Sequence, residues 1–305
     1  MRTAGYGVPG ARSTGATPSV AGPSAARRTE KGASRTYEML PARVHGMIET
    51  QATPSVRCPA PRWPPDTGPR GPRRQREAEH TMATRAALFD IDGTLVDTNH
   101  LHVVAWWEAF RRAGHTVPTS TIHRAIGLGS QDLIAHLLGD ERDPARDEGI
   151  SAAHTELYAE YFDRLAPFED AGDLLRSLAD RGWRIVLATS AGDAELGALR
   201  RAIGADDVIA DIAGGDDVEA GKPAPDPVCL ALEKAGVPAE RAVFVGDSVW
   251  DMEAASHAGV RAVALLSGGL PRTALESAGA DEIYADATDL LARLDSSAFA
   301  RLEDH

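Results

Sequence analysis

Short apolar runs recur along the chain from residue 85 onwards, and stretches with helical periodicity separate them. The runs predict strands buried on both faces, over residues 85–90, 183–189, 208–212, 242–245, 260–265 and 282–284. The intervening stretches predict amphipathic helices, for example over 171–180, 194–203, 226–235 and 250–258. A glycine follows each of these four stretches, as is typical of helix C-termini. The alternation predicts an α/β fold, a doubly wound parallel sheet that binds ligands at the carboxyl ends of its strands.

One interval departs from this alternation. Between residues 98 and 167 only helical patterns occur, over 100–113, 120–126, 131–138 and 147–165. We therefore expect a small all-helical cap domain over 98–167, inserted directly after the first strand. The Rossmann-like catalytic core is expected to comprise 82–97 and 168–305. Because the insertion follows the carboxyl end of the first strand, the cap is predicted to be a lid over the ligand site.

Residues 1–81 have a different composition. They hold 11 of the 19 prolines and 13 Lys and Arg against 6 Asp and Glu, without apolar periodicity. Such a segment cannot bury enough apolar surface to offset chain entropy, so we predict a disordered, basic, Pro/Gly-rich tail. No apolar segment follows Arg27-Arg28, which argues against a secretory signal. We favour a mis-called start, with Met82 as the natural one; a tail without a specific role and a nucleic-acid-binding arm are the alternatives.

Charge and cysteine content limit the partners and the compartment. The whole chain carries a net charge of −13 despite its basic tail, so the predicted core and cap are strongly acidic. This argues against nucleic acids and anionic membranes as partners. No apolar stretch approaches the roughly 18 residues of a membrane span. Cys58 and Cys229 are too few for a disulfide framework, so we predict a cytoplasmic protein in which Cys229 is a buried core residue.

Acidic and hydroxyl side chains gather where the predicted strands end. In chain order they are Asp90 and Asp92, Thr189 and Ser190, and Asp247 and Asp251. Lys222, one of three lysines in the chain, precedes Pro223, a residue that can open a helix. Two carboxylates spaced two residues apart at the end of a strand point the same way. The pattern predicts a crevice in which several carboxylates lie close to the ammonium of Lys222.

These residues resemble, in order and spacing, the four motifs of the haloacid dehalogenase-like hydrolases. The matching segments are Asp90-x-Asp92-Gly93-Thr94-Leu95, the strand-terminal Thr189, Lys222 in Gly-Lys-Pro-x-Pro-Asp, and Gly246-Asp247-Ser248-x-x-Asp251. The resemblance covers about residues 84–290. The helical interval resembles the cap of the branch that contains phosphoglycolate phosphatases and β-phosphoglucomutases.

The resemblance implies a phosphatase, a phosphoric monoester hydrolase acting on a small phosphorylated metabolite such as a sugar phosphate or phosphoglycolate. It assigns Asp90 as the nucleophile that forms an aspartyl-phosphate and Asp92 as the general acid and base. The same residues disfavour a dehalogenase and a phosphonate hydrolase, because these relatives lack an acid at the position of Asp92.

The resemblance also implies a cofactor and its ligands. Carboxylates cannot approach a phosphate dianion without a counter-charge, and Mg²⁺ fits this need best. The expected metal ligands are the carboxylates of Asp90 and Asp247 and the backbone carbonyl of Asp92, with Asp251 supporting the metal's shell. The residues expected to bind phosphoryl oxygens are Thr189, Ser190 and Lys222.

Two other functions stay open. His102 and Trp106 lie in a segment similar to the one that enters the cap of β-phosphoglucomutases, so a hexose phosphomutase is the enzymatic alternative. The cap loop at 126–131 is small and neutral where this resemblance wants an arginine, and Gly246 stands where those mutases carry an acid. Both departures favour a phosphatase. The non-enzymatic alternative is a silent binding protein on the same fold, although every catalytic position holds its working residue.

Specificity is expected to come from the cap. The cap residues that we expect near the substrate are His102, Arg124, Gly129, Ser130 and Gln131. Packing within the cap is the alternative for His102, and a surface position is the alternative for Arg124. Three further cap histidines, His115, His136 and His154, are predicted to be ordinary surface residues. The sequence does not predict the oligomeric state.

Overall fold

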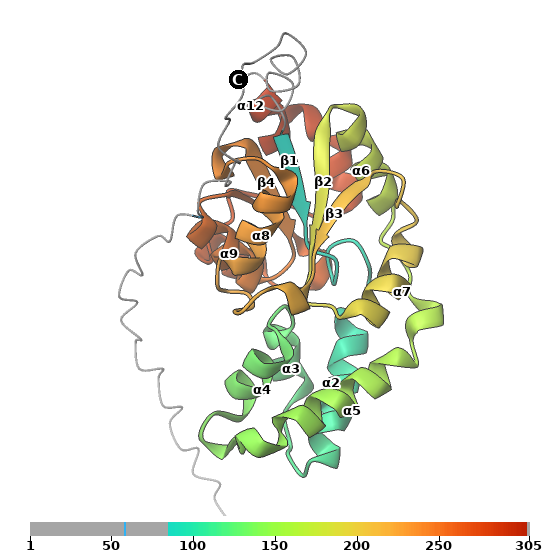
Figure 1. Cartoon of the computed structure of the whole chain (residues 1–305), viewed down its shortest axis with the longest axis vertical. Coiled ribbons are helices and arrows are strands. Elements are labelled where there is room, and N and C mark those ends of the chain that lie inside the picture. The colour runs from blue at the N-terminus through green and yellow to red at the C-terminus, as the bar shows by residue number, and fades with distance from the viewer. Residues whose placement is uncertain (1–57, 59–84, 304–305) are drawn as a thin grey trace, which may run out of the picture. The chain divides into compact units, whose positions relative to one another are not determined.

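Six parallel strands form one sheet in the part of the chain that the computed structural model describes, Cys58 and residues 85–303 (Figure 1). The strands are β1 (Arg85–Phe89), β2 (Trp183–Ala188), β3 (Ile209–Ala213), β4 (Ala242–Gly246), β5 (Arg261–Leu265) and β6 (Glu282–Tyr284). Their order is β3-β2-β1-β4-β5-β6, which places β1 between β2 and β4. Each strand falls on a predicted apolar run, so the predicted parallel sheet is confirmed.

Helices cover both faces of the sheet. One face packs against α6 (Ala171–Asp180), α7 (Asp193–Ile203), α11 (Ala287–Ala292) and α12 (Ala298–Glu303). The other face packs against α8 (Asp226–Ala235), α9 (Val249–Ala258) and α10 (Arg272–Ser277). Phe89 and Val245 belong to the first apolar layer and Leu88 and Phe244 to the second, because successive side chains of a strand point to opposite faces. Burial on both faces explains why the strands are predominantly apolar.

A helical cap lies between β1 and α6 in the sequence. It contains α2 (Asn99–Arg112), α3 (Thr119–Ala125), α4 (Ser130–Leu138) and α5 (Asp147–Ala159). These helices gather beyond the end of the sheet at which β1 stops (Figure 1) and pack around an apolar core of their own that includes Trp106 and Phe110. The predicted all-helical cap after the first strand is therefore confirmed.

The chain leaves the core for the cap and returns from it at one place. Val96 forms an antiparallel bridge with Pro167, and the Asp97 amide donates to the Ala166 carbonyl at 3.0 Å. This pairing supports the domain boundaries predicted at 97/98 and 167/168, which we keep as a proposal.

Two expectations were wrong. The helix predicted over 147–165 ends at Ala159, because Phe162–Arg164 forms a separate 3-10 turn and Leu165 packs against the core of the sheet. Cys229 is only partly buried, and it forms a disulfide with Cys58. The two cysteines are 171 residues apart in the sequence, so no local pattern could indicate the pairing.

The predicted disorder of residues 1–81 and the predicted start at Met82 lie outside the described residues, apart from Cys58. Among the helices that are described, none combines the length and the apolar character needed to cross a membrane. The cytoplasmic location stays a prediction.

Candidate active site

Three buried carboxyl groups meet at the carboxyl ends of β1 and β4. Asp90 directly follows β1, Asp247 directly follows β4, and Asp251 lies on the first turn of α9. The two strands are paired, and their pairing continues beyond β1 because the Asp90 amide donates to the Val245 carbonyl at 2.9 Å. One carboxylate oxygen from each of the three acids lies within 4.8 Å of the others.

Lys222 is the cation of this cluster. Its side chain is 1% exposed, and its Nζ lies 2.5 Å from Asp90 Oδ1 and 2.7 Å from Asp251 Oδ1. The ammonium also donates to the Ala188 carbonyl at the end of β2, at 3.1 Å. Burial opposes the charged ammonium, but Asp251 and Asp90 together raise the pKa of Lys222 above its ordinary value. Lys222 therefore links the ends of β1 and β2 to the first turn of α9 through one buried charge.

One ammonium does not neutralise three buried carboxylates. Burial raises the pKa of Asp90 to about 7; Lys222 opposes this rise, and the neighbouring carboxylates of Asp251 and Asp92 add to it. Burial and the neighbouring carboxylates of Asp251 and Asp90 raise the pKa of Asp247 well above its usual range. A site that is short of positive charge and lined by hard oxygen donors fits a divalent cation. The cluster could therefore hold such an ion.

Asp247 is held by two side chains that the sequence analysis did not select. Thr94 Oγ1 donates to Asp247 Oδ1 at 3.1 Å, and Asn99 Nδ2 donates to Asp247 Oδ2 at 2.8 Å. The loop after β5 also approaches closely, since a methyl group on Gly268 would overlap the Asp247 carboxylate. Thr94 belongs to the first motif and Asn99 is the first residue of α2. Both donors to Asp247 therefore lie in or just after the turn that follows β1.

Asp92 points away from this cluster and toward the cap. Thr98 Oγ1 donates to Asp92 Oδ1 at 2.7 Å, and His102 Nε2 on α2 lies 3.3 Å from the same oxygen. Burial works against the charged carboxylate, but His102 and Thr98 outweigh it and lower the pKa of Asp92. Two acids of one motif, Asp90 and Asp92, thus have pKa values shifted in opposite directions by their surroundings.

His102 lies between two carboxylates from different parts of the core. Its Nε2 is 3.4 Å from Glu195 Oε1 on α7, in addition to its contact with Asp92. Its Nδ1 lies 3.2 Å from Nε2 of His154 on α5, and its ring stacks on Tyr158 at 3.9 Å. Burial raises the pKa of Glu195 to about 7, with His102 opposing the rise and Asp92 adding to it.

Sequence reasoning missed Glu195 and placed His154 wrongly. His154 is 6% exposed and stacks on Trp106 at 4.0 Å, so the expected surface position is wrong. Burial is the main cause that lowers its pKa to about 2, which keeps the ring neutral. Glu195 lies on the first turn of an amphipathic helix, where acidic residues are common, and no spacing in the sequence connects it to His102.

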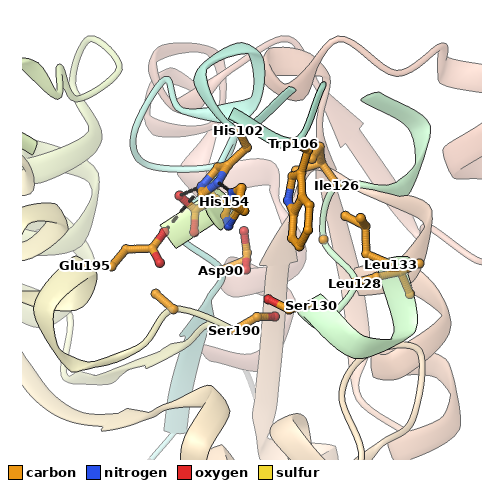
Figure 2. A pocket seen from close by; sticks show the side chains of 13 residues that line it. Asp90, His102, Trp106, Ile126, Leu128, Ser130, Leu133, His154, Ser190 and Glu195 are labelled. Atoms are coloured by element: carbon orange, nitrogen blue, oxygen red, sulfur yellow. Dashed lines mark hydrogen bonds and ion pairs between the residues drawn. The ribbon is translucent and has the colours of Figure 1, made fainter. Parts of the chain in front are cut away.

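A cavity of about 70 Å³ lies between the core and the cap. Asp90 lies in the middle of this cavity in Figure 2, with His102, His154 and Glu195 on one side of it. The apolar side chains on the other side are Trp106, Ile126, Leu128 and Leu133. Ser130 and Ser190 also line the cavity.

The remaining predicted site residues take different positions. Thr189 is buried, and its Oγ1 accepts from the Ala191 amide at 3.0 Å. Gly129 is partly buried at the start of α4 but does not line the cavity. Arg124 and Gln131 are exposed and lie outside the lining. Of the five predicted cap residues, His102 and Ser130 line the cavity.

Comparison with known proteins agrees with this geometry. The family model of the haloacid dehalogenase-like hydrolases matches residues 84–259. A phosphoglycolate phosphatase from Rhodospirillum rubrum is 32% identical over 219 residues, which cover 68% of this chain and 89% of that protein.

Solved structures of similar proteins have the same fold. A hydrolase from Pseudomonas syringae aligns with a TM-score of 0.67 and 33% identity, over 70% of this chain and all of that one. CbbY from Rhodobacter sphaeroides, solved in complex with phosphate, aligns with a TM-score of 0.58 and 31% identity, over 68% of this chain and 96% of that one. The family match covers more than half of this chain, and the motifs lie together at the strand ends. The chain therefore belongs to the haloacid dehalogenase-like hydrolases, as its motifs predict.

Proposed function

We propose that this protein is a Mg²⁺-dependent phosphatase, a phosphoric monoester hydrolase that acts on a small phosphorylated metabolite. The observation that carries the proposal is the buried cluster of Asp90, Asp247 and Asp251 around Lys222, with Asp92 two residues after Asp90 and held by Thr98 and His102. Membership of a hydrolase family and the phosphatase activity named for the R. rubrum relative support this function.

The two acids after β1 divide the chemistry. The Asp90 carboxylate attacks phosphorus, the bond to the leaving oxygen breaks, and an aspartyl-phosphate forms. Asp92 gives its proton to the leaving alkoxide and then takes a proton from the water that hydrolyses the aspartyl-phosphate. A phosphate dianion beside Asp92 raises the pKa of that carboxyl, so substrate binding favours the protonated form that the first step needs. Thr98 and His102 hold Asp92 in position for both transfers.

The other predicted residues bind charge. The carboxylates of Asp90 and Asp247 and the backbone carbonyl of Asp92 would hold Mg²⁺, with Asp251 supporting its shell. When bound, Mg²⁺ supplies the positive charge that lets a phosphate dianion approach these carboxylates. Thr189, Ser190 and Lys222 would bind the phosphoryl oxygens, and the Lys222 ammonium stabilises the charge that spreads over them.

Phosphate release from a panel of phosphate monoesters by the purified full-length chain tests this proposal, with Mg²⁺ and with a chelator. We expect release that needs Mg²⁺ and falls by at least about a thousandfold in Asp90→Asn, because this change removes the nucleophile. Asp180→Asn, a change at an exposed acid at the end of α6, is the matched control and keeps full activity. Equal release by Asp90→Asn and Asp180→Asn would contradict the assignment of the nucleophile.

A phosphomutase needs a cation in the cap to hold a second phosphate. Among the described residues that line the cavity there is no lysine or arginine. The structure therefore adds no observation in favour of this alternative.

A further inference from the structure

We propose that the leaving group of the substrate is a small alcohol that bears hydroxyl or ammonium groups and no second anionic group, and that Glu195 selects it. This inference rests on the proposed phosphatase function and names the substrate class. It is carried by the charges and hydrogen-bonding groups around the part of the cavity that the phosphoryl group leaves free.

The cavity offers a leaving group two different walls. The phosphoryl group must reach Asp90, which lies between these walls (Figure 2). Trp106 and Leu133 belong to the apolar wall, which can cover carbon atoms. Glu195 and His102 belong to the opposite wall, which presents hydrogen-bonding groups. Such a pair of walls suits a short alcohol with a carbon face and a polar face.

No lysine or arginine of the described chain is available there for a second negative charge. Among the described residues that line the cavity none is a lysine or an arginine. Lys222 is 1% exposed and is engaged by Asp90 and Asp251. Arg124 is exposed, outside the lining, and donates to Thr121. A carboxylate or second phosphate would be desolvated in this cavity without a partner, which is costly.

The imidazole of His102 is already paired with two carboxylates, so it does not supply the positive charge that a second anionic group would need. Its Nε2 already contacts both Asp92 and Glu195, and its Nδ1 contacts His154. Both ring nitrogens are therefore in use within the protein, and neither is left for an anionic group of the substrate.

Glu195 makes the polar wall selective. Its side chain is 17% exposed and reaches the cavity from α7, a helix of the core. An ionised carboxylate only accepts hydrogen bonds, so it can bind hydroxyl and ammonium groups and repels a carboxylate. This distinguishes the site from one built for phosphoglycolate, the substrate named for the R. rubrum relative.

Three two-carbon esters test the inference directly, because they differ only in the group at the far end. They are 2-hydroxyethyl phosphate, 2-aminoethyl phosphate and phosphoglycolate; glycerol 3-phosphate and 3-phosphoglycerate form a longer pair. Burial raises the pKa of Glu195 to about 7, so assays at about pH 8 keep its carboxylate ionised. We expect kcat/KM for phosphoglycolate to be at least about tenfold below that of 2-hydroxyethyl phosphate or 2-aminoethyl phosphate.

Variants at Glu195 separate selection from structural support. Glu195→Gln removes the charge, and we expect it to reduce the preference for 2-aminoethyl phosphate over phosphoglycolate by at least about tenfold. Glu195→Asp keeps the charge and should retain most of this preference. Glu148→Gln, at an exposed glutamate of α5, is the matched control and leaves the ratio unchanged. A purely structural role of Glu195 would lower all rates together and leave the ratio unaltered.

Acetyl phosphate, whose small acyl group carries no charge before cleavage, is the control substrate. If neither acetyl phosphate nor any ester is hydrolysed with Mg²⁺, the phosphatase function is overturned, and the inference with it. Hydrolysis of acetyl phosphate without hydrolysis of any ester would overturn both proposals, because no phosphate monoester is then a substrate. Phosphoglycolate as the best ester, or a preference for 2-aminoethyl phosphate over phosphoglycolate that Glu195→Gln leaves unchanged, would overturn the inference alone.

Discussion

At the scale of single residues, Lys222 decides whether carboxylates can share one buried site. Its ammonium is the partner of both Asp90 and Asp251. We expect Lys222→Met to lower the free energy of unfolding by about 3 kcal/mol, because it leaves buried carboxylates without their counter-charge. Urea unfolding measures this change. Lys234→Met removes a partly exposed ammonium and should cost about 1 kcal/mol or less; equal losses in the two variants would contradict the prediction.

Asp247 has the opposite effect on stability. Burial and two neighbouring carboxylates raise its pKa, so its charge is unfavourable in the metal-free protein. We expect Asp247→Asn to stabilise the metal-free protein by about 1 kcal/mol at about pH 8, while activity falls by on the order of a hundredfold. Thermal unfolding in chelator and phosphate release measure the two effects. A variant that is less stable than Asp180→Asn would show that the contacts from Thr94 and Asn99 outweigh the repulsion.

The residues that sequence reasoning found and missed differ in how they come together. Asp90 and Asp247 follow neighbouring strands, so the parallel sheet alone predicts that they meet. Glu195 on α7 meets His102 only because the cap closes on the core, and His154 on α5 meets His102 through the packing of two cap helices. The helices that carry Glu195 and His154 show no unusual spacing in the sequence. The packing of one helix or domain on another is not encoded in local periodicity, which is why the polar wall of the cavity could not be predicted.

At the scale of elements, the local sequence pattern predicted the positions of the strands better than the C-terminus of the last cap helix. The strands are bounded by a change from apolar to polar residues, which the sequence shows directly. After Ala159 the apolar positions continue, but Leu165 packs against the core of the sheet instead of the cap. The chain must turn back there toward the bridge between Val96 and Pro167, and that requirement comes from the tertiary structure.

The loop between α3 and α4 closes directly on the core. A Cβ atom on Gly127 would lie 2.7 Å from Ser248 Oγ and 3.1 Å from Trp250 Cδ1. We expect Gly127→Ala to hold this loop away from the core and to lower kcat/KM at least about tenfold, because the cavity then closes incompletely. Steady-state kinetics measure the effect.

Gly114 provides the control for this change. Both glycines have positive φ, +103° for Gly127 and +88° for Gly114, but nothing lies within 4 Å of a Cβ built on Gly114. Gly114→Ala should therefore show a similar loss of stability, about 1 kcal/mol, and normal activity. An equal loss of activity in both variants would assign the effect to backbone strain instead of loop closure.

At the scale of the whole molecule, the excess of buried acid couples folding to protons and to metal. The raised pKa values of Asp90 and Glu195, both about 7, mean that the folded state holds more protons than the unfolded state between about pH 4 and pH 7. These two groups therefore stabilise the fold below that window, and their contribution is lost as the pH rises through it. His154 acts in the opposite direction, because its pKa is lowered and the unfolded state binds its proton first.

A divalent cation distinguishes the contribution of the carboxyl cluster to stability from that of His154, because the cation competes with protons at the cluster and does not bind His154. Mg²⁺ that binds the folded state at about a hundred times its dissociation constant adds about 2.7 kcal/mol to the free energy of unfolding. Protonation of Asp90 and Asp247 opposes this binding, so we expect the stabilisation by Mg²⁺ to be larger at about pH 8 than at about pH 5.5. Urea unfolding with Mg²⁺ and with chelator at both pH values measures the difference, and Asp247→Asn should abolish it. Equal stabilisation at the two pH values would show that the metal does not bind at these carboxylates.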